Sequence, residues 1–227
     1  MRLSIIVPAF NEAANIEAAL QPLQPMRQRG AEVILVDGGS TDGTRSLAAP
    51  RVDCVVDSER GRAMQMNAGA RAACGDALLF LHADSLLPED GDAWIQRALA
   101  TPGAHWGRFD VEIAGAHFMF PVIAWFMNHR SRLSGIATGD QGIFVTRGAF
   151  DEMGGFADQP LMEDVEFCNR MRARSRPVCV HGATITTSGR RWQQHGIWNT
   201  ILLMWRLRLY YHCGASPHTM HRAYCGK

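Results

Sequence analysis

The sequence predicts an α/β protein built on a mostly parallel central sheet that is flanked by helices on both faces. Three observations predict this fold class: apolar and β-branched runs recur before residue 85, segments with helical spacing separate them, and glycine or polar clusters follow their carboxyl ends. Strands that alternate with helices form βαβ units, whose strands pair in parallel. The 227 residues are enough for one domain with a substantial core.

The elements of the first half follow from apolar runs and the residues that interrupt them. LSIIV is β-branched, and Pro8 is expected to end it. In the next segment Ile16, Ala19 and Leu20 recur at helical spacing. Strands are therefore expected at 3–7, 33–36, 52–57 and 77–84, and helices at 11–23, from residue 42 or 44 onward, and at 61–74.

After residue 100 the pattern becomes less regular. Strands are expected at 105–113 and 142–150, and helices at 118–135, 163–173 and 196–212. No internal repeat or low-complexity linker divides the chain. We expect a single domain over 1–227, in which residues up to about 100 form a first half, about 101–195 a second half built onto it, and 196–227 a C-terminal helix and tail.

Composition limits the function classes and the compartment. Hydrophobic residues make up 47% and charged residues 20%, and the formal net charge of +1 gives no reason to expect a nucleic-acid partner. The six cysteines form no CxxC pair, which excludes a zinc knuckle and suits a reducing compartment. The N-terminus enters a strand at once and leaves no room for a signal peptide, so a cytoplasmic protein is expected.

Polar segments at the carboxyl ends of the parallel strands predict one ligand crevice, because such ends meet at the same edge of the sheet. VDGGSTDGT places Asp37 and Asp42 around Gly39, where an acid can accept hydrogen bonds from a ribose or base, although a tight turn with a helix cap explains the same residues. The pattern is neither GxGxxG nor GxxxxGK[ST], which disfavours hydride transfer and ATP hydrolysis.

Two further segments suit a metal-bound diphosphate. Arg60 and Arg62 lie at a predicted helix start, where guanidinium and N–H groups attract phosphate, unless they form only a solvated basic face. Asp84 follows the strand LLFL, and one carboxylate together with a diphosphate is enough for Mg²⁺ or Mn²⁺.

In this order, the segments resemble the family 2 glycosyltransferases, which have a GT-A fold with a Rossmann-like sheet. The resemblance extends from residue 4 to about 192, and it is specific because the motifs occur together. They read SIIVPAFNEAANI, VDGGSTDGT, GRAMQMNAGA, LFLHAD, GDQGIFVTRGAF, GGFADQPLMEDVEFCNRM and TSGRRW.

The resemblance implies a nucleotide-sugar site in the first half. The last acid of the family's DxD motif, which holds the metal, corresponds to Asp84, whereas the first acid is replaced by His82. A neutral imidazole can donate to a ribose but adds no negative charge beside a cation, and a structural core histidine is the alternative. The donor is expected to contact Pro8, Ala9, Glu12, Asp37, Gly39, Arg62, His82 and Asp84.

The resemblance places catalysis and the acceptor in the second half. MEDVEF matches the family's ED motif, which implies Asp164 as the general base of an inverting displacement and Glu163 as its supporting residue. The QxxRW signature is incomplete, because Ser188 replaces its glutamine, which disfavours processive synthesis. The acceptor or the diphosphate is expected to contact Asp140, Gln141, Arg190, Arg191 and Trp192.

The partners expected are a nucleotide-diphospho-sugar donor and a hydroxyl acceptor, either a small molecule or lipid-linked. Residues 196–212 have too short an apolar core for the roughly 20 residues that span a bilayer. They are expected to contact the inner face of a membrane peripherally, or to serve as a core or homodimer helix. Two rival functions are a nucleotidyltransferase and a non-catalytic sugar-nucleotide-binding protein.

Overall fold

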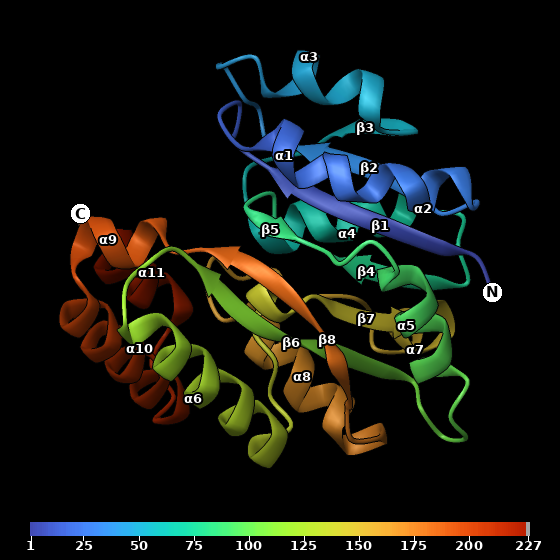
Figure 1. The fold of residues 1–227 in the computed structure, drawn as a ribbon. Coiled ribbons are helices and arrows are strands. Elements are labelled where there is room, and N and C mark those ends of the chain that lie inside the picture. Colours follow the sequence, from blue (N-terminus) through green and yellow to red (C-terminus); the bar gives the residue numbers. More distant parts are fainter. Residues whose placement is uncertain (226–227) are drawn as a thin grey trace.

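The computed structural model describes residues 1–225, and within them eight strands form one sheet in the order β3-β2-β1-β4-β7-β6-β8-β5 (Figure 1). The first four are parallel, as is the pair β6 and β8, whereas β7 is antiparallel to both its neighbours and β5 is antiparallel to β8. The predicted α/β class is confirmed. The strands are β1 (Leu3–Ala9), β2 (Glu32–Asp37), β3 (Cys54–Asp57), β4 (Ala77–Phe80), β5 (Ser85–Leu86), β6 (Trp106–Ala114), β7 (Ile143–Thr146) and β8 (Val178–Ser188).

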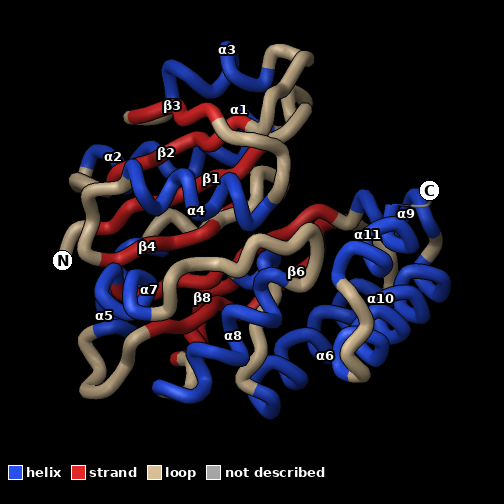
Figure 2. Tube along the Cα trace, turned by 180° about the vertical axis from the view of Figure 1, so that it is seen from behind, coloured by secondary structure: helices blue, strands red, loops and turns tan. Residues whose placement is uncertain are grey.

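Helices cover both faces of this sheet, as Figures 1 and 2 show from opposite sides. One core cluster packs the first two helices and α5 on one face, and a second packs α4, α7 and α8 on the other. The α-helices are α1 (Ile16–Leu20), α2 (Gln24–Gln28), α3 (Thr44–Ala48), α4 (Arg62–Ala72), α5 (Gly91–Leu99), α6 (Met119–Ser134), α7 (Arg147–Glu152), α8 (Glu163–Arg174), α9 (Arg190–His195), α10 (Ile197–His212) and α11 (Pro217–Cys225). Three short 3-10 turns are η1 (Gln21–Leu23), η2 (Ala49–Arg51) and η3 (Gly139–Gln141).

Several boundaries differ from those expected. Pro8 does not end β1: the register with β2 continues to Ala9, while pairing with β4 stops at Ile6, so the missing N–H of proline interrupts no pairing on that side. The helix expected over 11–23 is confined to short turns from Ile16 onward. Strand β8 was not expected, because VCVHGATITTS interrupts its apolar alternation with glycine and histidine, and a register shift lies opposite this interruption.

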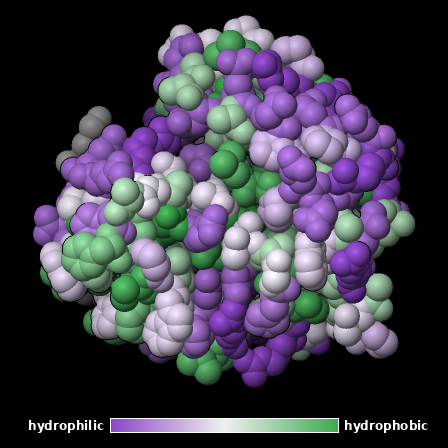
Figure 3. All heavy atoms as spheres, in the orientation of Figure 1, coloured by the Kyte–Doolittle hydropathy of each residue, from purple (hydrophilic) through white to green (hydrophobic). Residues whose placement is uncertain are grey.

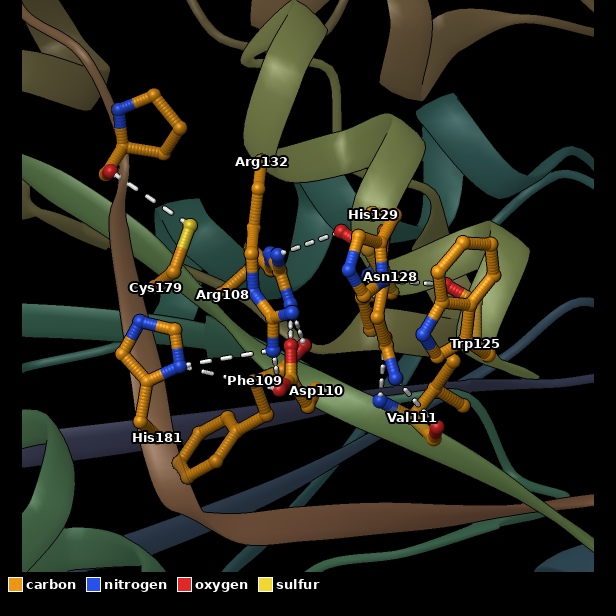
Figure 4. Close-up of polar contacts among 12 residues, drawn as sticks. Arg108, Phe109, Asp110, Val111, Trp125, Asn128, His129, Arg132, Cys179 and His181 are labelled. Atoms are coloured by element: carbon orange, nitrogen blue, oxygen red, sulfur yellow. Dashed lines mark hydrogen bonds and ion pairs between the residues drawn. The ribbon is translucent and has the colours of Figure 1, made fainter. Parts of the chain in front are cut away.

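A polar cluster fastens α6 to the sheet (Figure 4). Asp110 on β6 accepts hydrogen bonds from Arg108, which is fully buried, and from Arg132 on α6. Asn128, also on α6, accepts a hydrogen bond from the Val111 N–H and donates one to its carbonyl, each at 2.9 Å. Because these bonds are specific in direction, they fix the rotation of α6 on β6.

The C-terminal helices pack on the second half of the sheet. Leu207 of α10 and Met220 of α11 are buried against Leu161 and Met162, which precede α8. Ile197 and Ile201 of α10 pack against Phe120 of α6. No helix within residues 1–225 combines the length and the apolar character needed to cross a membrane.

Candidate functional site

The carboxyl ends of β1 and β2 lie side by side at the edge of the sheet where a ligand is expected. Asp37, only 4% exposed, accepts a hydrogen bond from the Ser40 N–H at 3.0 Å through Oδ2. Its other oxygen, Oδ1, is buried and has no hydrogen-bond partner among the described residues. A buried carboxylate oxygen without a partner is costly, so it is suited to accept a donor group from a ligand.

Backbone and side-chain contacts hold this edge in place. Ala9 lies opposite Asp37, Pro8 lies beside it, and the Gln65 amide of α4 donates to the Ala9 carbonyl at 2.8 Å. Gly39 has a φ of +85°, and a Cβ built there would meet no atom within 4 Å, so the turn is open in front of the acid. A role for Gln65 at this edge was not predicted from the sequence. The available signal was that Gln65 is a polar residue among the buried residues of α4.

Glu12 and Asp84, expected to contact the donor, are joined by Arg190. The Arg190 Nη2 lies 3.3 Å from Oε2 of Glu12 and 3.8 Å from Oδ2 of Asp84. A backbone hydrogen bond joins the same two segments, because the Ser188 N–H donates to the Asp84 carbonyl at 3.2 Å. The chain after β8 thereby brings a cation to the carboxyl end of β4.

Asp84 has the chemistry of a ligand for a hard divalent cation. Its side chain is 33% exposed at the crevice, and its carboxylate oxygens are the donor type that Mg²⁺ and Mn²⁺ prefer. In the described part of the chain, no three histidine, cysteine, aspartate or glutamate side chains gather into a metal-binding group. One carboxylate completed by diphosphate oxygens therefore fits these residues.

His82 has a defined partner in the structure. The side chain is nearly buried, and Nδ1 lies 3.4 Å from Oδ1 of Asp140. On its other side, a Cβ on Gly139 would lie 2.2 Å from Nε2, so only glycine permits this approach. The imidazole thus connects the segment after β4 with η3, which belongs to the second half of the chain.

Glu163 and Asp164 begin α8 after a strained residue. Met162 has a φ of +64°, a conformation that a side chain other than glycine rarely adopts. The Asp164 carboxylate accepts the Gly139 N–H at 3.0 Å through Oδ2 and the Val165 N–H at 2.7 Å through Oδ1. These bonds orient the carboxylate between α8 and η3.

Burial and neighbouring charges shift the pKa values of Glu163 and Asp140 in opposite directions. Burial raises the pKa of Glu163, and the charge of Asp164 raises it further, against the opposing charge of Arg62. Burial would also raise the pKa of Asp140, but hydrogen bonding to His82 and the charges of His82, Arg62 and Arg191 bring it below the ordinary value. Glu163 is therefore biased toward its neutral form and Asp140 toward its ionised form.

The Arg62 guanidinium interacts electrostatically with the same acids. Desolvation would lower the pKa of Arg62, but Tyr224 and the carboxylates of Glu163, Asp140 and Asp164 raise it above its ordinary value. Arg62 starts α4, whereas these acids belong to η3 and α8. Charged residues from the start of α4, from η3 and from α8 therefore act on one another, although they are far apart in the sequence.

Three residues expected on the acceptor side are otherwise engaged. Gln141 is fully buried, and its amide accepts the Thr138 N–H at 3.2 Å in a capping box. The Trp192 indole packs with apolar residues of α6 and α10. The Arg191 guanidinium lies 3.7 Å from the centre of the Tyr224 ring, so α11 holds it.

Most of α10 faces outward. Only Thr200 and Leu207 of this helix are buried, whereas Trp198, Leu202 and Trp205 are 69%, 62% and 72% exposed. Exposed aromatic residues on α6 continue this surface, and Figure 3 shows hydrophobic spheres in green over the corner where α6 and α10 lie in Figure 1. We call this surface the α6–α10 face; it comprises Phe118, Val122, Trp125, Phe126, Trp198, Leu202, Trp205 and Leu209.

Comparison with solved structures supports the fold. A mannosyltransferase from Pyrobaculum calidifontis, solved with GDP-Man and Mn²⁺, superposes with a TM-score of 0.71 at 23% identity and covers 99% of this chain and 64% of its own. Glucosyl-3-phosphoglycerate synthase from Mycobacterium tuberculosis gives a TM-score of 0.67 at 18% identity, with 94% of this chain and 80% of its own covered. At these identities the likeness concerns the fold.

Comparison with curated proteins identifies relatives by sequence. The succinoglycan biosynthesis protein ExoA of Rhizobium meliloti is 36% identical over 107 residues, and a PGL/p-HBAD biosynthesis glycosyltransferase of Mycobacterium bovis is 41% identical over 93 residues. These matches cover 43% and 38% of this chain but only 32% and 36% of those proteins, so the chain spans about a third of the relatives it matches. The family model described as glycosyl transferase family 2 matches residues 4–155, about two thirds of the chain. The protein therefore belongs to glycosyl transferase family 2.

Proposed function

We propose that this protein transfers a sugar from a nucleotide-diphosphate donor to a hydroxyl group of an acceptor. The observation that carries the proposal is the contact of His82, from the first half, with Asp140 of η3, whose neighbour Gly139 donates its N–H to Asp164. Family membership and donor-bound structural neighbours support it. The rival nucleotidyltransferase function loses support, because the matching family model is a glycosyl transferase.

We assign donor binding to the first half, residues up to about 100. The unpartnered Asp37 Oδ1 accepts a hydrogen bond from the nucleoside, beside Pro8, Ala9 and Gly39. Arg190, held between Glu12 and Asp84, is placed to pair with the diphosphate, in preference to Arg191, which α11 engages.

Asp84 is our candidate ligand for Mg²⁺ or Mn²⁺. A bound cation would supply charge stabilisation for the leaving diphosphate. Structural neighbours contain Mn²⁺, which supports divalent metal use. His82 pairs with Asp140 and so connects the segment that holds Asp84 with the proposed acceptor half.

We assign the transfer step to Asp164. Its carboxylate takes the proton of the acceptor hydroxyl while the oxygen forms the new bond to the anomeric carbon, and the bond to the diphosphate breaks with its electron pair on the leaving oxygen. Attack opposite to the leaving group inverts the anomeric configuration. Glu163 supports Asp164 from the neighbouring position, where burial and the charge of Asp164 raise the pKa of Glu163.

The second half, about 101–195, would receive the acceptor, and residues 196–227 would add a peripheral contact. The α6–α10 face is broad, aromatic and exposed, which suits a membrane surface that holds a lipid-linked acceptor. Replacing both Trp198 and Trp205 with glutamine should abolish co-flotation with phosphatidylcholine vesicles. Dimer dissociation in the variant, with no vesicle binding by the wild type, would assign the face to a homodimer instead.

The decisive experiment is a thermal-shift screen of nucleotide sugars with and without Mn²⁺, followed by measurement of released nucleoside diphosphate. One donor should stabilise the protein, and Asp84→Ala should remove the Mn²⁺-dependent part of that stabilisation. Glu89→Gln is the matched control, because Glu89 is an exposed acid outside the crevice.

The outcomes separate the competing functions. Stabilisation and release of nucleoside diphosphate support a glycosyltransferase. Binding without any release, even with varied acceptors, would instead indicate a non-catalytic sugar-nucleotide-binding protein. Unchanged metal dependence in Asp84→Ala would refute the metal assignment alone.

A further inference from the structure

A second cavity, of about 500 Å³, lies between α6, α8 and α10. Arg130 reaches it from α6, Arg172 from α8, and Arg208 and His212 from α10. Asn169 adds a polar amide to the lining, and no carboxylate of residues 1–225 lines the cavity. The basic groups therefore come from three helices that are distant in the sequence and meet only in the folded chain.

The three guanidinium groups differ from other arginines on α6 and α8 in their ion pairing. Among the described residues, neither Arg130, Arg172 nor Arg208 forms an ion pair with an aspartate or glutamate side chain. The Nη2 atom of Arg130 is buried without a hydrogen-bond partner. By contrast Arg132 and Arg170, on the same helices, pair with acids. Arg130 and Arg208 are half-buried, and Arg172 is exposed. Like charges that lie close together repel one another, and a bound anion would relieve that repulsion.

The cavity borders the proposed catalytic base. Met162 and Val165, which flank the Glu163–Asp164 pair, form part of its wall. Burial lowers the pKa of Arg130, and the negative charge of Asp164 opposes that shift, so the two groups are close enough to interact. A ligand held by the arginines would thus lie next to Asp164 rather than in the donor crevice at Asp37 and Asp84.

We propose that this cavity binds the phosphate group of a phosphorylated acceptor, so that the acceptor's hydroxyl lies toward Asp164. The inference rests on the proposed function for the role of the ligand, but the anion site itself does not depend on it. Phosphate suits the site because its several oxygens can accept hydrogen bonds from more than one guanidinium fork at once. A volume of about 500 Å³ also leaves room for the group that bears the phosphate.

Binding of inorganic phosphate to the full chain tests the site. Equilibrium dialysis at constant ionic strength should show saturable binding by the wild type, reduced about tenfold or more in Arg172→Gln and in Arg208→Gln, since each loses a charged hydrogen bond. Arg206→Gln is the matched control, because Arg206 is exposed on the same helix as Arg208 and outside the cavity. Its affinity should equal that of the wild type.

Folding is checked by the unfolding midpoint of each variant, and the two single variants test the site independently. No phosphate binding by the wild type, or binding by both variants that equals that of the wild type, would overturn the proposal. Donor-induced thermal stabilisation should be unchanged in both variants. If no donor binds the wild type while phosphate binding still requires these arginines, the proposed function fails and the anion site stands.

Vesicle binding distinguishes the sources of the phosphate. Stronger co-flotation with vesicles containing phosphatidic acid than with phosphatidylserine vesicles, lost in Arg208→Gln, would indicate a lipid phosphate. Equal co-flotation with both, alongside arginine-dependent binding of inorganic phosphate, would indicate a water-soluble phosphomonoester. Both results support the anion site.

Discussion

Replacing Asp164 with asparagine removes the proposed base while keeping the shape of the side chain. General-base catalysis contributes about 10²–10⁴-fold to a rate, which corresponds to about 2.7–5.5 kcal/mol in the activation barrier. We therefore expect nucleoside diphosphate release to fall by that factor. Donor binding should be unchanged, because Asp37, Asp84 and Arg190 are untouched.

The structural cost of the same change is smaller. Asp164 accepts two backbone hydrogen bonds, from Gly139 and Val165, and an asparagine oxygen can keep only one of them. Losing one such bond costs about 1–3 kcal/mol, against a total stability of about 5–15 kcal/mol. The variant should thus remain folded, and a lost rate can be read as lost chemistry.

The assay is release of nucleoside diphosphate from the donor identified by thermal shift, at a pH where the wild type is active. Glu163→Gln is the informative comparison, because the raised pKa of Glu163 favours the neutral acid that glutamine imitates. Its rate should fall by less than that of Asp164→Asn. A large loss in Glu163→Gln with full activity in Asp164→Asn would refute the reasoning and transfer the role of base to Glu163.

Three further predictions concern stability. Asp110→Ala should lower the free energy of unfolding by about 3–5 kcal/mol in urea denaturation, because it leaves the buried Arg108 without its carboxylate; a loss below ~1 kcal/mol would contradict this. Gly69→Ala should cost about 1–3 kcal/mol, since its Cβ would lie 2.4 Å from a side-chain carbon of β1, and an unchanged midpoint would show that the helix shifts freely. Hydrogen bonding to Arg29 lowers the pKa of Asp92 in the folded protein. The ionised Asp92 should therefore stabilise the fold above about pH 4, where the unfolded acid is ionised, and this stabilisation should disappear as the pH falls through the lowered folded pKa. The free energy of unfolding of Asp92→Asn should differ from that of the wild type at neutral pH but not in strong acid.

Local patterns in the sequence were enough to predict the buried strands β1 and β2 and the buried face of α1. The runs LSIIV and VILV are buried in every residue, and Ile16, Ala19 and Leu20 share the buried face that their spacing predicted. Hydrophobic periodicity is a local signal, because burial on one face constrains residues that are close in sequence. The order of the strands in the second half, with β7 antiparallel between β4 and β6, depends on long-range pairing and was not available from it.

The candidate site divides in the same way. Asp37 is the last residue of β2, as expected, whereas β4 ends at Phe80 and Asp84 lies in the turn before β5. The structure adds what the sequence left open for His82, since its partner is Asp140. Gln141 and Trp192 are counterexamples, because their residue types suit sugar binding but the fold uses them elsewhere. Gln141 closes a capping box, and Trp192 packs in an apolar cluster. A side chain's direction depends on packing against distant elements, which residue type does not encode.

The sequence by itself determined the α/β class, the parallel first half and the position of Asp37 at the end of a strand, because each depends on neighbours within a few residues or on a motif kept in order. Only the tertiary structure decided that Arg190 joins Glu12 to Asp84, and that Arg130, Arg172 and Arg208 share one cavity. Those arginines lie up to 78 positions apart in the printed numbering (208 − 130 = 78). The physical reason is that charge and hydrogen bonding act through space, so their partners are set by chain folding rather than by sequence spacing.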